Sequence, residues 1–281
     1  MFDALTIEPA DRYHADRGPV SASALARFAR SPAHYRAWAD GEIPDEPTPA
    51  MRLGSAVHCA VLEPNEWGVR YVVQPADVDR RNKEGKAWAA AQGDREILTA
   101  DQGEVVWGIR RAVERHPLAS ALLLRTPGVN ERVARWTDKA TGLACKARMD
   151  RVCIHDLGLG PEPVIVDLKT ASDASPDGFR RTLGNNNGRQ CVHYQSALEA
   201  LGIAAAAPFL WVVTETAAPF SVAVYAMPAR ARMAMVDQYR RELQRLAVCL
   251  AANDWPGYTP DDQPMEIDLP PWWYRQTEEG D

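Results

Sequence analysis

The heptapeptide Val-Ile-Val-Asp-Leu-Lys-Thr at Val164–Thr170 constrains the fold more than any other stretch of the chain. Its apolar, β-branched residues are typical of a buried strand. Because side chains alternate between the two faces of a strand, Asp167 and Lys169 point to the same side. Burying such charges is costly unless they pair or bind a cation. The stretch is therefore either a structural ion pair or part of a hydrolytic site, in which the acid holds a metal and the lysine acts on water.

A second acid precedes this strand at a spacing that fits a hairpin. Asp150 lies in the run Leu143–Ile154, and the segment His155–Pro163 is rich in residues that form turns. We expect the two runs to pair as neighbouring strands, with Asp150 on one and Asp167 and Lys169 on the other. Sixteen residues separate the two acids.

The order Asp150, Asp167, Lys169 resembles the signature of the PD-(D/E)XK nucleases, with Met149 where the proline of that name would stand. The motif is short, so the rest of the chain matters. Gln190–Tyr194 opens an expected helix and resembles the Gln-x-x-x-Tyr helix of the RecB-type branch.

Further segments, over roughly residues 18–255, resemble the RecE-like (exonuclease VIII) group of phage-type exonucleases. They are Gly54–Pro64, Val20–Leu25, Ser31–Tyr35 and Asp79–Lys86. The resemblance implies an α/β (α+β) fold of the restriction-endonuclease type, with a central mixed sheet flanked by helices. It also implies one nuclease domain over residues 20–255, between an irregular N-terminal segment 1–19 and an irregular C-terminal tail 256–281.

The activity that the resemblance implies is metal-dependent hydrolysis of DNA, 5′→3′ on linear double-stranded DNA, in phage-type recombination. Alternatives are a RecB-type endonuclease, a single-strand nuclease, a catalytically silent DNA-binding module and an unrelated metal-dependent hydrolase. The expected partners are double-stranded DNA ends, a single-strand annealing protein and further copies of the chain in a ring.

The expected metal ligands are Asp150 and Asp167, with Mg²⁺ the favoured ion and Mn²⁺ an alternative, because the ligands are hard oxygens. The backbone carbonyl of Leu168 is a further candidate. The resemblance adds Glu131 and His58 as ligands. An exposed strand charge and a buried core histidine are the respective alternatives for these two residues.

Other residues are expected to act on water or phosphate. Lys169 would orient the attacking water or lower its pKa. Gln190 and Tyr194 would position the lysine, the water or a phosphate, or simply pack their helix. The candidates for holding a terminal 5′-phosphate are Arg17, Ser21 and Ser23. Helix capping explains the two serines equally well.

The net charge of −6 opposes DNA binding, since phosphate contacts favour a basic surface. Local basic clusters offset this objection. The first is Arg80, Arg81, Lys83 and Lys86, which a solvated loop explains equally well; the second surrounds the expected hairpin and comprises Arg132, Arg135, Lys139, Lys146, Arg148 and Arg151.

Composition sets wider limits. No apolar run reaches the length of about 18 residues that a membrane span needs, and the acidic N-terminus lacks the layout of a signal peptide. Five scattered cysteines give no support for a zinc or iron–sulfur site. We therefore expect a cytoplasmic protein. Among the local elements, we expect helices over Ser21–Asp40, Met51–Leu62 and Pro228–Asn253, and two strands over Phe209–Thr216 and Ser221–Met227.

Overall fold

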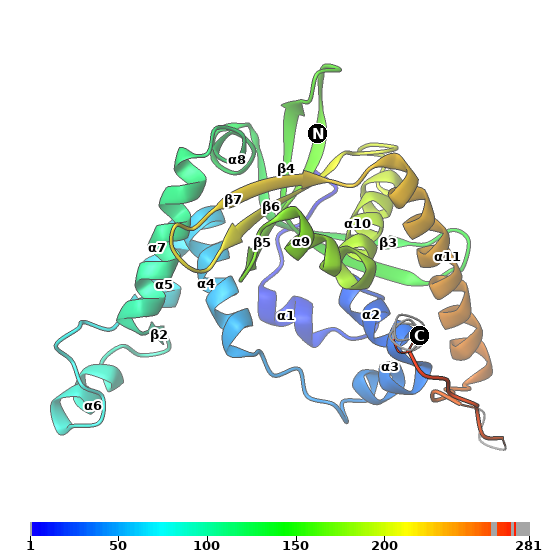
Figure 1. Ribbon diagram of the computed structural model, residues 1–281, viewed down its shortest axis with the longest axis horizontal. Coiled ribbons are helices and arrows are strands. Elements are labelled where there is room, and N and C mark those ends of the chain that lie inside the picture. Colours follow the sequence, from blue (N-terminus) through cyan, green and yellow to red (C-terminus); the bar gives the residue numbers. More distant parts are fainter. Residues whose placement is uncertain (1, 260–262, 271–272, 274–281) are drawn as a thin grey trace, which may run out of the picture.

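The structure, a computed structural model, describes residues 2–259, 263–270 and 273. Its centre is a five-stranded mixed sheet in the order β3-β4-β5-β6-β7 (Figure 1). Only β5 and β6 run parallel within that sheet. The strands are β3 (Gly128–Thr137), β4 (Ala144–Asp156), β5 (Pro161–Ala171), β6 (Phe209–Glu215) and β7 (Val222–Ala226). This architecture confirms the expected fold class.

The predicted hairpin is formed by β4 and β5, which pair antiparallel. Their paired residues run from Asp156↔Pro161 to Arg151↔Val166. On β5, Val164, Val166 and Leu168 belong to one core and Ile165 to the other. The strand therefore alternates between two buried faces, and Asp167 and Lys169 share the face of Ile165.

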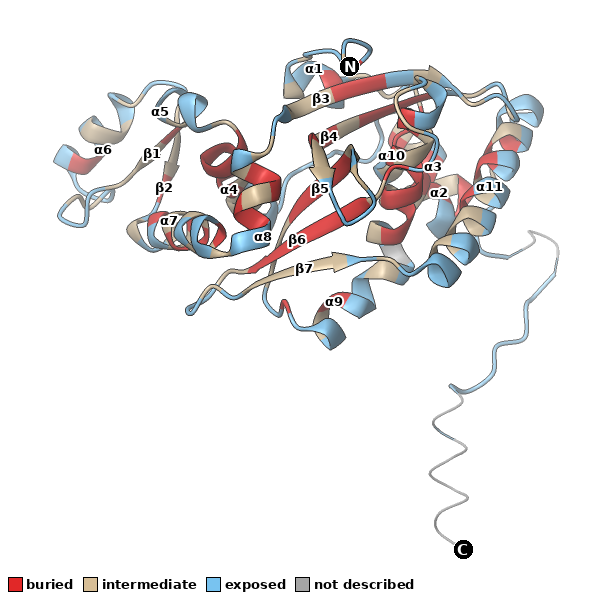
Figure 2. Ribbon diagram, turned by 90° about the horizontal axis from the view of Figure 1, so that it is seen from above, coloured by how far each residue is buried: buried red, intermediate tan, exposed pale blue. Residues whose placement is uncertain are grey.

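Helices cover both faces of the sheet (Figure 2). One face carries α4 (Pro49–Leu62), α7 (Ala100–Arg115) and α8 (Pro117–Ser120). The other carries α9 (Pro176–Thr182) and α10 (Gly188–Ala200). Outside α10 pack three more helices, α2 (Ala22–Arg30), α3 (Pro32–Ala39) and α11 (Ala229–Ala252).

The single helix expected over Ser21–Asp40 was wrong. The helix is interrupted at Ser31. The backbone of Ser31 is extended, and its Oγ accepts a hydrogen bond from the backbone N–H of His34. Pro32 then takes the first position of α3, where its missing N–H costs nothing. The helices expected over Met51–Leu62 and Pro228–Asn253 are confirmed as α4 and α11.

The N-terminal segment, expected to be irregular, contains the helix α1 (Ala10–Ala15) and is fastened to the sheet at both ends. Thr6 pairs with Val133 on β3, and the backbone of Val20 bonds to Ala144 and Lys146 on β4. We call residues 6–20 the strap. The folded unit therefore begins before residue 20.

A small lobe projects from the body in both ribbon views (Figures 1 and 2). It contains α5 (Trp67–Arg70), α6 (Lys83–Ala90) and the parallel strands β1 (Tyr71–Val73) and β2 (Glu96–Leu98). Three short helical turns complete the elements: η1 (Pro64–Glu66), η2 (Ala121–Arg125) and η3 (Leu183–Asn187).

Between Asp254 and Pro270 the described residues form no helix or strand. Much of the expected tail after Pro270 lies outside the described residues. Among the helices that the structure describes, none combines the length and apolar character needed to cross a bilayer.

Candidate metal centre

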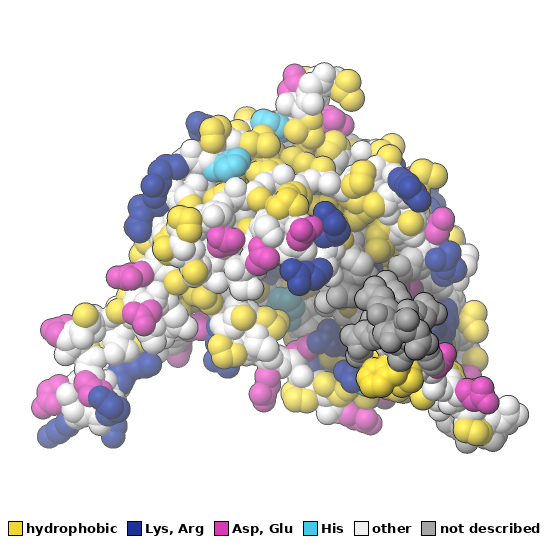
Figure 3. Space-filling model, viewed as in Figure 1, with side chains coloured by type: hydrophobic (Ala, Val, Ile, Leu, Met, Phe, Trp, Pro, Cys, Tyr) yellow, Lys and Arg dark blue, Asp and Glu magenta, His cyan; other side chains and the backbone are white. Residues whose placement is uncertain are grey.

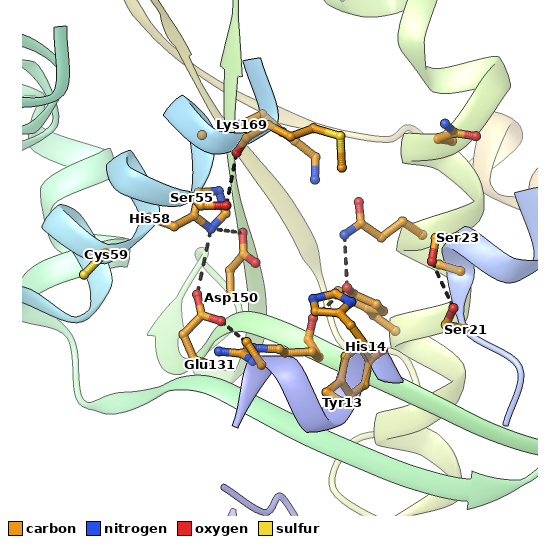
Figure 4. Close-up of a pocket in the computed structure, with 18 of the residues that line it drawn as sticks. Tyr13, His14, Ser21, Ser23, Ser55, His58, Cys59, Glu131, Asp150 and Lys169 are labelled. Atoms are coloured by element: carbon orange, nitrogen blue, oxygen red, sulfur yellow. Dashed lines mark hydrogen bonds and ion pairs between the residues drawn. The ribbon is translucent and has the colours of Figure 1, made fainter. Parts of the chain in front are cut away.

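Side chains from both sides of the sheet meet in one pocket of about 540 Å³ (Figure 4). Its wall includes residues of α1, α2, α4, the strands β3, β4 and β5, and α10. Of the predicted site residues, the structure places His58, Glu131, Asp150, Lys169, Gln190, Tyr194, Ser21 and Ser23 on this wall.

Three of these side chains converge. One ligand atom from each of His58, Glu131 and Asp150 lies within 4.8 Å of the other two. Nδ1 of His58 is 3.6 Å from Oδ2 of Asp150 and 3.8 Å from Oε1 of Glu131. Figure 4 shows the three groups pointing toward one another. One nitrogen and two carboxylates form a donor set that suits a divalent cation.

His58 is oriented by its second ring nitrogen. The helix α4 that carries it begins with Thr48 as its cap and Pro49 in its first turn. Nε2 of His58 donates to the carbonyl oxygen of Leu168, 2.8 Å away. Because Nε2 keeps its hydrogen, Nδ1 faces the two acids and offers its lone pair to a cation once its own proton is lost. The Leu168 carbonyl, which was expected to ligate metal, therefore serves in this structure as the acceptor that orients His58.

Asp150 lies where the β4–β5 ladder ends. The last paired residues are Arg151 and Val166. Beyond them, the backbone N–H of Leu168 donates to Oδ2 of Asp150 at 2.8 Å. A carboxylate thus takes the place of a backbone carbonyl in the ladder. The local opening of the hairpin presents an acid to the pocket without leaving the N–H of β5 unpaired.

Glu131 occupies a strained backbone position. Its φ is +50°, in the left-handed region that costs a residue with a Cβ about 1–3 kcal/mol. The β3–β4 pairing skips it, between Asn130↔Arg151 and Arg132↔Met149. Nε of Arg148 donates to Oε2 of Glu131 at 2.8 Å. The strain and the arginine together aim the carboxylate at His58.

Two of the three groups, His58 and Asp150, hold their protons more tightly than usual. Burial alone would lower the pKa of His58, but Asp150 and Glu131 raise it to about 9. Burial raises the pKa of Asp150 to about 7, helped by Asp167 and Glu131 and opposed by His58. For Glu131, burial acts upward, but His58 and Arg148 bring its pKa below the usual value. Carboxylates crowded in this way favour a cation that can replace the bound protons.

Asp167 lies behind this group. Its side chain is 1% exposed and does not line the pocket. Oδ2 pairs with Nζ of Lys169 at 2.7 Å, and Oδ1 accepts from Nε2 of Gln190 at 2.9 Å. Burial opposes the charge on Lys169, but Asp167 and Asp150 raise its pKa, so it stays an ammonium. A direct metal contact by Asp167 stays a prediction.

The expected Gln-x-x-x-Tyr pair links Asp167 on β5 to the backbone of Arg148 on β4. Nε2 of Gln190 also donates to the hydroxyl oxygen of Tyr194 at 3.1 Å. The Tyr194 hydroxyl donates to the carbonyl of Arg148 at 2.6 Å. The two residues lie on one face of α10 because they are four positions apart. Their contacts hold Asp167 in place, and through Asp167 they position Lys169.

Of the three residues predicted to bind a 5′-phosphate, the two serines line the pocket and the arginine does not. Ser21 and Ser23 line the pocket, with their hydroxyl oxygens 3.0 Å apart. Ser21 also caps α2, accepting from the backbone N–H of Ala24. Arg17 does not line the pocket: its guanidinium donates to the Trp38 carbonyl and lies 4.0 Å from Asp45.

The predicted basic clusters also divide. Arg80, Arg81 and Lys83 lie at and before the start of α6 in the lobe, and none lines the pocket. Lys146 and Arg151, expected near the DNA, are 3% and 5% exposed. Both donate to backbone carbonyls, so they stabilise the fold.

Two pocket residues, Arg148 and His14, were missed as site residues. Arg148 precedes Asp150 by two positions on β4, and that alternation was a signal that could have found it. The strap places His14 in the pocket, and no local sequence pattern predicts this position.

The family model described as "PDDEXK-like domain of unknown function (DUF3799)" matches residues 21–261. The crystal structure of a "Putative exonuclease" from Eubacterium rectale is similar over 98% of this chain and 99% of that one, with a TM-score of 0.57 and 12% identity. At that identity the likeness concerns the fold alone.

A second solved structure, of SSO0001, covers 72% of this chain and 87% of that one at 14% identity. Its TM-score of 0.30 is too low to indicate a shared fold. A search of curated proteins found no match. The family match covers most of the chain and includes every residue of the converging group. The chain therefore belongs to the family of PDDEXK-like domains.

Proposed function

We propose that this protein is a metal-dependent deoxyribonuclease that hydrolyses phosphodiester bonds, acting as a 5′→3′ exonuclease on linear double-stranded DNA. The observation that carries the proposal is the convergence of His58, Glu131 and Asp150 within 4.8 Å, in a pocket that Lys169 also lines. The PDDEXK-like family supports the nuclease class. The strand polarity and the duplex substrate come from the RecE-like resemblance of the sequence.

The donor set fits a divalent cation, with Mg²⁺ favoured and Mn²⁺ an alternative. His58, Glu131 and Asp150 would hold the ion. When bound, it would supply Lewis acidity and charge neutralisation at the phosphate.

The chain's own residues have separable tasks in this proposal. The ammonium of Lys169, held by Asp167, donates a hydrogen bond to the attacking water and fixes its direction. Gln190 keeps Asp167 turned toward the lysine. Ser21 and Ser23 offer hydroxyl donors for a phosphate at the opposite end of the pocket (Figure 4). Homo-oligomerisation in a ring and cooperation with a single-strand annealing protein, from the same resemblance, and a cytoplasmic location, from the composition of the sequence, complete the proposal.

The test uses purified protein, Mg²⁺ and linear duplexes labelled at the 5′ or the 3′ end. We expect the wild type to degrade them and Asp150→Asn to lose more than about 100-fold in rate, because a charged ligand is gone. Asparagine can still accept from the Leu168 N–H, so the hairpin should stay folded.

Asp156→Asn is the matched control, since this exposed acid lies at the far end of the same strand. It should digest DNA at the wild-type rate. Full activity in Asp150→Asn would refute the metal centre. Equal cleavage of closed circular and linear duplex would instead favour the endonuclease alternative.

A further inference from the structure

The strap, residues 6–20, lies wholly outside the family match, which begins at residue 21. It crosses the part of the β3–β4 ribbon that extends beyond β5. At one end, Thr6 and Val133 exchange two backbone hydrogen bonds of 2.9 Å. At the other end, Val20 donates to Ala144 and accepts from Lys146, at 2.8 and 2.9 Å. The strap is therefore part of the sheet structure at both of its ends.

Charged side chains of the ribbon fix the middle of the strap. Lys146, almost fully buried, donates to the carbonyls of Tyr13 and Asp16 and lies 4.2 Å from the centre of the Tyr13 ring. Arg135 pairs with Glu8 at 3.0 Å and with Asp16 at 2.7 Å. These contacts hold α1 against the ribbon in a defined position.

The result is that α1 forms part of the pocket wall. Tyr13 and His14 line the same pocket as the converging acids, and Figure 4 shows His14 beside Tyr13 there. The His14 ring packs edge-on to Tyr13 at 5.2 Å. Within the described part of the chain, no group hydrogen-bonds to its ring nitrogens. Although His14 is exposed, desolvation by neighbouring groups, then Arg148 and Lys146, lower its pKa, which favours the neutral ring with one N–H donor.

We propose that the strap completes the nuclease site and that His14 hydrogen-bonds a phosphate of the DNA strand held there. The inference rests on the proposed function. Arg148 lines the same pocket, and its buried Nη1 has no hydrogen-bond partner among the described residues. A phosphate oxygen accepts from both an imidazole N–H and a guanidinium.

The test compares His14→Ala, His14→Gln and Arg12→Ala with the wild type. Binding of 3′-labelled linear duplex is measured by fluorescence anisotropy in EDTA, where no cleavage occurs, and kcat/KM is measured with Mg²⁺. Loss of one hydrogen bond to a charged group should weaken both by about 10- to 100-fold in His14→Ala. His14→Gln keeps a donor and should recover most of the loss.

Arg12→Ala is the matched control, since Arg12 lies on α1 outside the pocket and should change neither quantity by more than about twofold. Thermal melting checks that each variant is folded. Each duplex is made with a 5′-phosphate and with a 5′-hydroxyl. A loss confined to the 5′-phosphate duplex assigns the contact to the terminal phosphate, and an equal loss on both assigns it to an internal phosphodiester.

Unchanged binding and kcat/KM in His14→Ala, with an active wild type, would overturn the inference and leave the proposed function standing. Equal losses in His14→Ala and His14→Gln, with lowered melting temperatures, would reduce the strap to a structural role and also overturn it. A wild type that neither binds nor cleaves DNA would refute the proposed function itself.

Discussion

The Asp150 carboxylate contacts both a backbone amide and a histidine ring. Its Oδ2 accepts from the Leu168 backbone and faces the His58 ring. The first contact fixes the position of the carboxylate, and the second favours its charged form against the effect of burial. An acid that also serves the backbone ladder cannot move away, so the ligand group is positioned before any cation arrives.

The raised proton affinities of this group predict how stability depends on pH. The native pKa values of Asp150, about 7, and His58, about 9, both lie above their usual values of 3.8 and 6.5. A group with a raised native pKa stabilises the fold at low pH, and this stabilisation is lost as pH rises through the native pKa. We expect the melting temperature of the metal-free protein to fall between pH 6 and pH 9.

Calorimetry would measure this melting temperature, and two comparisons would test the cause of its fall. Mg²⁺ should raise the melting temperature more at pH 9 than at pH 6, because it competes with protons for the same groups. Asp150→Asn removes the acid and most of the cause of the His58 shift, so its melting temperature should vary less over this interval. A wild-type profile as flat as that of the variant would contradict the assignment of these pKa values.

At the scale of elements, the sequence predicted the strands and turns that depend on local alternation of residues. It missed the elements whose structure depends on packing against distant parts of the chain. Strand periodicity and turn residues predicted the β4–β5 hairpin and the shared face of Asp167 and Lys169. The break at Ser31 was missed, although a serine followed by proline is a local stop signal. The strap was missed because its structure depends on contacts with residues more than 100 positions away, such as Val133 and Lys146.

The strap also gives an element-scale prediction. Lys146→Met keeps the length of the side chain but leaves the carbonyls of Tyr13 and Asp16 without their buried donor. Unpaired buried carbonyls cost about 1–3 kcal/mol, so guanidinium denaturation should show a loss of that size in the free energy of unfolding. Lys139→Met is the control, because Lys139 is exposed in the turn after β3. A loss no larger than the control's would show that Lys146 does not hold the strap.

At the scale of the whole molecule, the candidate metal centre and the predicted basic cluster of the lobe lie in different places. The acids converge in the body, whereas Arg80, Arg81 and Lys83 lie in the projecting lobe, where Figure 3 shows basic and acidic side chains together. Arg81 is 91% exposed and pairs with Asp79. An exposed pair of this kind contributes little to stability. The Arg81 guanidinium can therefore leave Asp79 and pair with a DNA phosphate at little cost. A protein with a net charge of −6 would then contact a duplex through a local cluster.

Removing this cluster should weaken DNA binding without changing the chemistry. In Arg80→Ala/Arg81→Ala/Lys83→Ala, the slope of log Kobs against log salt for a long duplex should fall by about 0.9 for each phosphate that is no longer neutralised. The rate at saturating duplex should stay at the wild-type value, because none of the three lines the pocket. The control, Arg111→Ala/Arg115→Ala/Arg125→Ala, removes the same charge near the opposite end of α7. Equal slopes for the two triple variants would mean that the lobe does not contact DNA, and a slower saturated rate would place it in the catalytic step.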